Sequence, residues 1–233
     1  MTASFKNPQK LWYLKHIHLF SGLSETDLQE LDQHAKMVTV NKGEIIFIPG
    51  DPADTVYLLK KGRVKIIMAD LGGKEFTAEI LQPGEIFGDM DFSEQSVRTM
   101  RAEAREDAVI CALPREDFER YLSRHPNLIV SLLEVIRSRF RKLQSQVEDL
   151  AHREVQARLA HLLLDLAKFD GVPNDRQIHI RAQLTHQEMA DLIGCSWETV
   201  STTVGQFRDQ GLIGTEARTI TILKPETLSR LVS

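Results

Sequence analysis

The chain has 233 residues, which is enough for two compact domains, and its formal net charge is −4. This charge excludes a generally basic nucleic-acid-binding protein. No apolar run is as long as a membrane span and no signal-peptide pattern precedes Phe5, so we expect a cytoplasmic protein without a membrane partner. Cys111 and Cys195 stand far apart and form neither a disulfide framework nor a metal-ligand spacing, so no metal site is expected.

The first half of the chain alternates short apolar runs with turn residues. Ser24, followed three residues later by Asp27, predicts the capped start of a short helix. Beyond it, turns that contain glycine separate a series of short strands. The strands are expected at 38–40, 45–48, 56–59, 64–68, 76–81 and 109–113. Many short strands with regular glycine turns are typical of a small sandwich or roll.

A long helix is predicted from Pro126 to about His152. Its apolar residues recur at steps of three and four, a heptad pattern that is sustained for about two and a half heptads. The stripe consists of Leu133, Ile136, Phe140, Leu143, Val147 and Leu150. Two copies of the helix that pair along a seam would show this pattern, and so would one helix packed on its own domain.

The segment from Leu184 to Ile213 has the clearest local pattern in the chain. Thr185 and Glu188 have the spacing of a capping box at a helix start. Gly194 suits the left-handed end of that helix, and Ser196 is a natural cap for a second helix. Two short capped helices joined by a tight turn predict a helix-turn-helix, although an ordinary surface helix pair shares some of these features.

The second helix of this pair is expected to have two distinct faces. Val200, Val204 and Phe207 form its apolar stripe. The residues expected to face outward are Trp197, Thr199, Ser201, Thr202, Thr203 and Gln206. Gly211 ends the helix, and residues 214–223 indicate a β-hairpin. Helix, turn, helix and β-hairpin together describe a winged helix, which lays its second helix in the major groove of DNA.

This segment resembles the DNA-binding domain of the Crp–Fnr family of bacterial transcription regulators. The resemblance is carried by Thr185-x-x-Glu188, Gly194-Cys195-Ser196, Glu198-Thr199-Val200 and Gly211-Leu212-Ile213. The first half of the chain is similar to the cyclic-nucleotide-binding β-roll of the same family. Glycines stand at the turns that the family uses, namely Gly43, Gly50, Gly62, Gly84 and Gly88. The resemblance covers essentially the whole chain.

The resemblance implies an α+β architecture in three parts. These are a jelly-roll-like, effector-sensing β-roll at residues 1–125, a central dimerisation helix at 126–152 and a winged helix-turn-helix at 153–233. It also implies a dimeric, sequence-specific transcription regulator that is not an enzyme. Its partners would be a second copy of the chain, double-stranded promoter DNA, RNA polymerase and a small-molecule effector. A dimer would bring two DNA-reading helices one DNA turn apart, so the resemblance favours the paired seam.

The resemblance further implies which residues contact DNA. They are Thr185, His186, Gln187, Ser196, Trp197, Glu198, Thr199, Ser201, Thr202, Gln206 and Arg208. The family's second helix begins Ser-Arg-Glu-Thr-Val and carries another arginine shortly after, whereas here Trp197 and Thr202 stand at the two arginine positions. An arginine that grips guanine is the commonest specific base contact, so we do not expect the usual family target sequence. Glu198 remains and could accept a hydrogen bond from a cytosine amino group.

A place for an effector phosphate is also implied by the resemblance. Gly88-Asp89 and Arg98-Thr99 match the family's Gly-Glu and Arg-Ser/Thr pairs. In such a site the glycine lets the backbone approach the ligand and the arginine neutralises the phosphate. Asp89 is one methylene shorter than the glutamate that contacts the ribose in the family.

The residues near the base are less typical of the family. Arg139 falls where cAMP-binding members also carry an arginine, but Leu143 and Gln144 replace the pair that faces adenine. We therefore expect a phosphate site without adenine selectivity. The effector could be cAMP, cGMP or a cyclic dinucleotide; a haem- or redox-based sensor and an effector-independent regulator are the alternatives. The four-cysteine pattern of iron–sulfur sensors is absent, because no cysteine precedes Cys111.

Overall fold

The structure of the chain, a computed structural model, describes residues 17–20, 22–70, 72–89, 96–174, 177–216 and 219–232. It divides into two compact units, Met1–Arg139 and Phe140–Ser233. The long helix α4 (Pro126–His152) contributes residues to both units, and its bounds confirm the predicted central helix. Among the described residues, no helix combines the length and the apolar character needed to cross a lipid bilayer.

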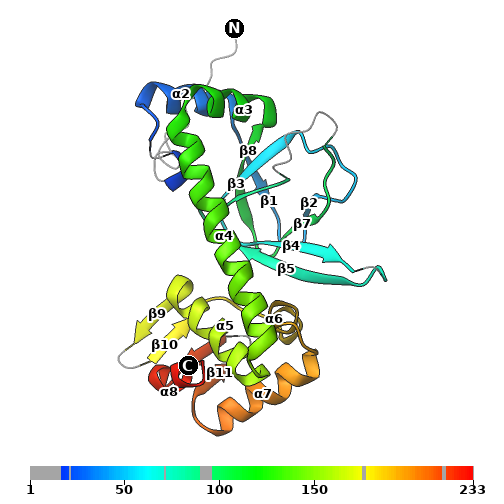
Figure 1. The fold of residues 1–233 in the computed structure, drawn as a ribbon, viewed down its shortest axis with the longest axis vertical. Helices are drawn as coiled ribbons and strands as arrows, with labels where there is room; N and C mark the ends of the chain where they lie inside the picture. Colours follow the sequence, from blue (N-terminus) through cyan, green and yellow to red (C-terminus); the bar gives the residue numbers. More distant parts are fainter. Residues whose placement is uncertain are drawn as a thin grey trace. The chain divides into compact units, whose positions relative to one another are not determined.

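The first unit is a β-roll made of two four-stranded sheets (Figure 1). One sheet has the strand order β1-β8-β3-β6 and the other β2-β7-β4-β5, with antiparallel neighbours. The strands are β1 (Lys36–Val40), β2 (Ile45–Phe47), β3 (Thr55–Lys61), β4 (Val64–Ala69), β5 (Glu75–Leu81), β6 (Ile86–Phe87), β7 (Arg101–Ala104) and β8 (Ala108–Pro114). All the predicted strands form, with ends that differ by one or two residues.

Two strands and one helix of the roll do not follow from the sequence pattern. β6 is only two residues long. β7 has the sequence Arg-Ala-Glu-Ala, without the β-branched or aromatic residues that favour strands. Its pairing with β2 and β4 holds it in place, and Ala102 and Ala104 are fully buried there. Helix α3 (Arg115–Arg124) begins directly after Pro114.

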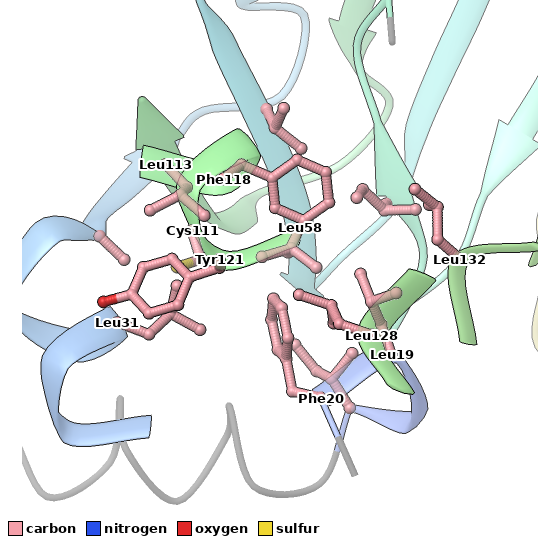
Figure 2. Packing of buried hydrophobic residues seen from close by; sticks show 14 of the residues in the cluster. Leu19, Phe20, Leu31, Leu58, Cys111, Leu113, Phe118, Tyr121, Leu128 and Leu132 are labelled. Carbon is pink, nitrogen blue, oxygen red and sulfur yellow. The ribbon is translucent and has the colours of Figure 1, made fainter. Parts of the chain in front are cut away.

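A hydrophobic core anchors the start of α4 to the roll. Figure 2 shows its members Leu19, Phe20, Leu31, Leu58, Cys111, Leu113, Phe118, Tyr121, Leu128 and Leu132. They come from the short helix η1 (His18–Phe20), from α2 (Glu25–His34) and α3, from strands β3 and β8, and from α4. Because Leu128 and Leu132 are only 2% and 7% exposed, the first two turns of α4 belong to the roll.

The local signals at the turns and caps are confirmed. Ser24 and Asp27 form the predicted capping box of α2. The turn glycines all have positive φ angles, namely Gly43, Gly50, Gly62, Gly84 and Gly88. At Gly62 a Cβ would also lie 2.5 Å from the carbonyl oxygen of Asp107, so the close approach of the two turns requires glycine.

The second unit contains the predicted winged helix-turn-helix (Figure 1). Its elements are α5 (Val155–Asp170), β9 (Gly171–Asn174), β10 (Gln177–Ile180), α6 (His186–Ile193), α7 (Trp197–Asp209), β11 (Ile213–Glu216), β12 (Thr219–Ile222) and α8 (Pro225–Arg230). The hairpin β11–β12 confirms the predicted wing, and β10 and β9 extend it to a four-stranded sheet. Neither strand is predicted from the sequence, and β9 carries a glycine and a proline, which are depleted in strands.

Candidate DNA-binding and effector sites

Side-chain caps fix the two helices of the helix-turn-helix. At the start of α6 the Thr185 hydroxyl accepts the Glu188 N–H at 3.1 Å, and the Glu188 carboxylate accepts the Thr185 N–H at 2.8 Å. Gly194 ends α6 with φ 64° and ψ 54°, the left-handed conformation expected for it. The Ser196 hydroxyl then accepts the Thr199 N–H at 3.3 Å and starts α7. The turn geometry therefore rests on residues that the sequence identifies.

Helix α7 has a buried face and a face that is open to solvent. The exposed residues are Trp197, Glu198, Thr199, Thr202, Gln206 and Arg208, while Ser201 is half-buried. The prediction that Thr203 faces outward is wrong, because its exposure is 4%. Thr203 lies three residues after Val200 and four before Phe207, so the helical repeat places it on the inner stripe. Its hydroxyl donates to the Thr199 carbonyl at 2.8 Å.

The DNA-binding candidates His186 and Gln187 lie in the first turn of α6 and not on α7. Gln187 is exposed, and its side-chain amide donates to the Asp191 carboxylate at 2.7 Å. His186 is half-buried. The first turn of α6 can therefore offer polar groups to a ligand, but one of them is already engaged within the helix.

An open groove of about 670 Å³ runs between the start of α5 and α7. Its lining from α7 includes Glu198, Thr202 and Gln206, and its other wall includes Arg153 and Gln156. The Gln156 side-chain amide donates to the Gln206 side-chain oxygen at 3.0 Å. Gln156 is therefore a candidate that the sequence reasoning missed, and no local signal could have found it, because the two glutamines are far apart in the chain.

Cys195 in the turn between α6 and α7 is half-buried, not fully buried as a simple packing residue would be. Burial raises the pKa of its thiol, and the nearby Arg158 guanidinium opposes this shift. A thiol with a raised pKa stays protonated at neutral pH and is a poor nucleophile. The structure thus gives Cys195 no feature of a reactive redox switch.

The four residues matched to a phosphate site come together in the roll. Thr99 donates its hydroxyl to Asp89 Oδ1 at 2.8 Å and its N–H to Asp89 Oδ2 at 3.4 Å. Arg98 Nη1 lies 4.0 Å from Asp89 Oδ2. A Cβ on Gly88, whose φ is 104°, would lie 2.8 Å from Arg98 Nη1, so only glycine lets the guanidinium lie against this backbone.

Arg98 is a buried charge, with an exposure of 2%. Its guanidinium lies over the rings of Phe47 and Tyr57, with its Cζ at 4.5 and 5.5 Å from the ring centroids, and Nη2 donates to the Thr55 carbonyl at 2.5 Å. Its Nε and Nη1 have no hydrogen-bond partner among the residues that the structure describes. A buried guanidinium with unpaired donors is costly, so this arrangement suits an anion that would take up the remaining N–H groups.

Three further effector candidates, Arg139, Leu143 and Gln144, form no hydrogen bond with Asp89, Arg98 or Thr99 in the described part of the chain. Arg139 donates to the carbonyl of Ile86, two residues before Gly88, so its side chain is held by backbone next to the site. Leu143 and Gln144 are exposed on α4 and belong to the second unit. Among the described residues, no three His, Cys, Asp or Glu side chains gather as a metal-binding group.

Comparisons with known proteins agree with both parts of this description. The family model of the cyclic nucleotide-binding domain matches residues 37–125, and that of the Crp-like helix-turn-helix domain matches residues 157–231. The global nitrogen regulator of Nostoc sp. is 35% identical over 194 residues, which cover 82% of this chain and 87% of that protein. The chain belongs to the Crp–Fnr family of bacterial transcription regulators.

Other members extend the similarity over nearly the whole chain. The CRP-like cAMP-activated global transcriptional regulator of Mycobacterium tuberculosis is 27% identical over 212 residues, 91% of this chain and 95% of that protein. A CRP-family transcriptional regulator from Thermus thermophilus has a solved structure with a TM-score of 0.70, 26% identity, and coverage of 84% of this chain and 96% of that chain. The resemblance inferred from the sequence is therefore confirmed, and the protein is a DNA-binding transcription regulator of the Crp–Fnr type.

The two neighbouring threonines on α7 test which face of the helix meets DNA. Thr202→Val should weaken binding to the regulator's own site by about 1 kcal/mol, roughly fivefold, because its hydroxyl lies on the exposed face. Thr203→Val should leave DNA affinity unchanged, because its side chain is buried. Both hydroxyls donate to the carbonyl four residues earlier, at 2.9 and 2.8 Å. The two variants therefore lose the same kind of hydrogen bond within α7, and they differ in whether the side chain is exposed. Equal losses in a fluorescence-anisotropy titration would contradict the orientation of α7.

Proposed function

We propose that the chain acts as a homodimer on a two-fold-related site in promoter DNA, and that an anionic effector bound in the β-roll changes its DNA affinity. The parts are the effector-sensing roll at 1–125, the dimerisation helix at 126–152 and the DNA-binding domain at 153–233, in a cytoplasmic regulator that meets RNA polymerase at the promoter. The observation that carries the effector proposal is the buried Arg98 guanidinium, two of whose nitrogens lack a hydrogen-bond partner among the described residues.

The dimer is supported by an apolar seam on α4 that is open to solvent. Its residues are Leu133 (58% exposed), Ile136 (47%), Phe140 (59%), Leu143 (58%), Val147 (65%) and Leu150 (53%). Apolar surface left in water costs about 25 cal/mol per Å², and a second copy of the same heptad stripe would cover it. From Ala151 onward the chain has nine basic and ten acidic residues, so one DNA-binding domain has no excess of positive charge for DNA. A two-fold pair supplies a second recognition helix and so strengthens binding.

The DNA-reading surface is proposed to be the exposed face of α7, together with the first turn of α6. Trp197, at the start of α7, is 51% exposed and offers an apolar surface suited to a thymine methyl or a sugar. Arg208, near the helix end, is exposed and suits a phosphate. With Trp197 and Thr202 in place of arginines, we infer a target site that differs from the guanine-centred site of many family members.

Two substitutions separate base reading from phosphate binding. Glu198→Ala should relax sequence preference at one base pair of each half-site, by about 1–3 kcal/mol of lost discrimination. Arg208→Ala should weaken binding to all sequences alike and reduce the dependence of affinity on salt, because it removes a phosphate contact. Selection of binding sites from random DNA, followed by titrations at two salt concentrations, measures both. If Glu198→Ala changed neither affinity nor preference, the proposed docking of α7 would be wrong.

The effector is proposed to be a cyclic nucleotide, namely cAMP, cGMP or a cyclic dinucleotide. A cyclic phosphate would take the unpaired donors of Arg98 and the hydroxyl of Thr99, which lie next to each other in the roll. The M. tuberculosis relative is named as a cAMP-activated regulator, which supports this class. Leu143 and Gln144 supply no pair of hydroxyls for an adenine base, so we propose no selectivity for one nucleotide base. The effector can act only through different affinities for two states of the dimer.

One observation favours a second candidate, a regulator that needs no effector. In the roll the Asp89 carboxylate already accepts the N–H and the hydroxyl of Thr99, and its Oδ2 lies 4.0 Å from Arg98 Nη1. This internal carboxylate engages Thr99, one of the two residues proposed to take the phosphate, so it would keep the roll in one state without a ligand. Under the first candidate Asp89 must give way to the incoming anion, and its charge opposes binding.

Calorimetric titration with cAMP, cGMP, cyclic di-GMP and pyrophosphate distinguishes these candidates. The wild-type protein should bind at least one of the three cyclic nucleotides, and this ligand should change the affinity of the protein for DNA. Asp89→Asn should raise the affinity for pyrophosphate by roughly tenfold, because it keeps the side-chain shape but removes a negative charge that lies 4.0 Å from Arg98 Nη1.

Arg98→Lys tests the guanidinium itself, because it keeps the buried charge but loses the fork of donors, and it should weaken binding of every anion. If no nucleotide bound and DNA affinity were full without any ligand, the effector-independent candidate would hold instead. A haem Soret band in the purified protein would overturn the nucleotide proposal.

A further inference from the structure

The last turn of α4 is tied to the DNA-binding domain by a compact group of charged side chains. Asp149 lies in that turn, Arg153 in the two-residue connection after it, and His161 in the second turn of α5. Asp149 Oδ1 accepts Arg153 Nη1 at 2.7 Å. Asp149 Oδ2 lies 2.6 Å from His161 Nδ1, which donates to it when the ring proton is on that nitrogen. One carboxylate therefore joins α4, the connection and α5.

Both ring nitrogens of His161 face acidic side chains, and a basic side chain lies beside the ring. His161 Nε2 is 3.4 Å from Asp165 Oδ2 on the next turn of α5, and Arg153 Nη1 is 3.2 Å from Nδ1. The side chains of Asp149, Arg153 and His161 are only 13%, 27% and 23% exposed. Partly shielded, charge-assisted hydrogen bonds of this kind hold their geometry better than exposed surface pairs.

The next residue of the same turn makes a second attachment. Leu150 lies against Gly194 in the turn between α6 and α7, and a Cβ at Gly194 would be 2.6 Å from Leu150 Cδ2. Because Gly194 has no side chain, the end of α4 can approach the helix-turn-helix closely. The last turn of α4 is therefore attached to α5 through Asp149 and to the turn before α7 through Leu150.

We infer that Asp149, Arg153 and His161 form a lock that fixes the direction of α7 relative to the end of α4. The inference rests on the proposed two-fold dimer. In that dimer the seam residues from Phe140 to Leu150 align the two α4 helices, so the angle at the α4–α5 connection sets the separation of the two α7 helices. A two-residue connection without the lock would let the angle vary, as hinges of a few residues do. The three side chains are positioning residues for half-site spacing.

The test measures the preference for half-site spacing. One added base pair moves a half-site by about 3.4 Å along the DNA and also rotates it, so a locked dimer should discriminate sharply between spacings. DNA duplexes would carry two copies of the selected half-site at the best spacing and with one or two base pairs added or removed. A duplex with a single half-site would report the affinity of one domain alone.

Asp149→Asn and His161→Gln break the lock, and Glu148→Gln is the matched control. Glu148 is the neighbouring, exposed residue of α4, and its substitution changes the charge by the same amount as Asp149→Asn. The wild type and Glu148→Gln should prefer the best spacing by about tenfold or more. Asp149→Asn and His161→Gln should reduce this preference to about threefold or less, with single-half-site affinity within about twofold of the control. The double variant should be no worse than either single variant, because both substitutions break one contact.

The outcomes separate the lock from the proposed function. If the two variants kept the spacing preference of Glu148→Gln, or lost affinity equally at every spacing and on the single half-site, the lock would be overturned while the dimeric regulator stands. If the wild type itself bound single and paired half-sites with the same affinity, the two-fold dimer would fail, and the lock would fail with it.

Discussion

Pairing of the apolar stripe along α4 with a second copy is the interaction on which the proposed dimer and its DNA binding depend. The helix begins inside the core of the roll, where Leu128 and Leu132 are buried, and then presents large apolar side chains from Leu133 to Leu150 to solvent. A stripe of this length with heptad spacing is stable when a second helix covers it. Pairing also explains how a DNA-binding domain with no excess of basic residues can hold DNA, because two half-sites act together.

Charged groups in both units are held by partners from their own chain. In the roll, the guanidinium of Arg98 lies on two aromatic rings near Asp89, and in the second unit Asp149 joins Arg153 and His161. Removing one partner of a buried ion pair is strongly destabilising, because it leaves an uncompensated charge. Under the proposed function, an effector anion beside Arg98 and Thr99 would keep the buried guanidinium paired.

Signals that lie close together in the sequence predicted their part of the fold well. The capping residues of α2, α6 and α7, the left-handed Gly194 and the heptad stripe each depend on residues within one or two helical turns. The prediction for Thr203 is wrong because it follows the polar neighbours of this residue, whereas the helical repeat places Thr203 with Val200 and Phe207 on the buried stripe. β7 lacks strand-forming residues and β9 carries a glycine and a proline, so pairing with neighbouring strands holds both in place.

The candidate sites depend on contacts between residues that are distant in the chain, and sequence patterns do not reveal such contacts. The match of Gly88-Asp89 and Arg98-Thr99 to a family pattern pointed to four residues that lie together in the roll, but not to the hydrogen bonds that Asp89 accepts from Thr99. The bond between Gln156 and Gln206 and the group around Asp149 join separate helices, and neither has a spacing that a sequence pattern could reveal. Tertiary packing alone brings such residues together.

Sedimentation equilibrium of the wild type and of the double substitution Leu143→Glu with Val147→Glu tests the central claim most directly. Both side chains lie on the exposed seam, so the variant should keep its helical circular-dichroism spectrum, sediment as a monomer and lose affinity for paired half-sites down to that of a single half-site. The wild type should sediment as a dimer. A variant that stayed dimeric, or a wild type that bound its DNA site fully as a monomer, would contradict the account.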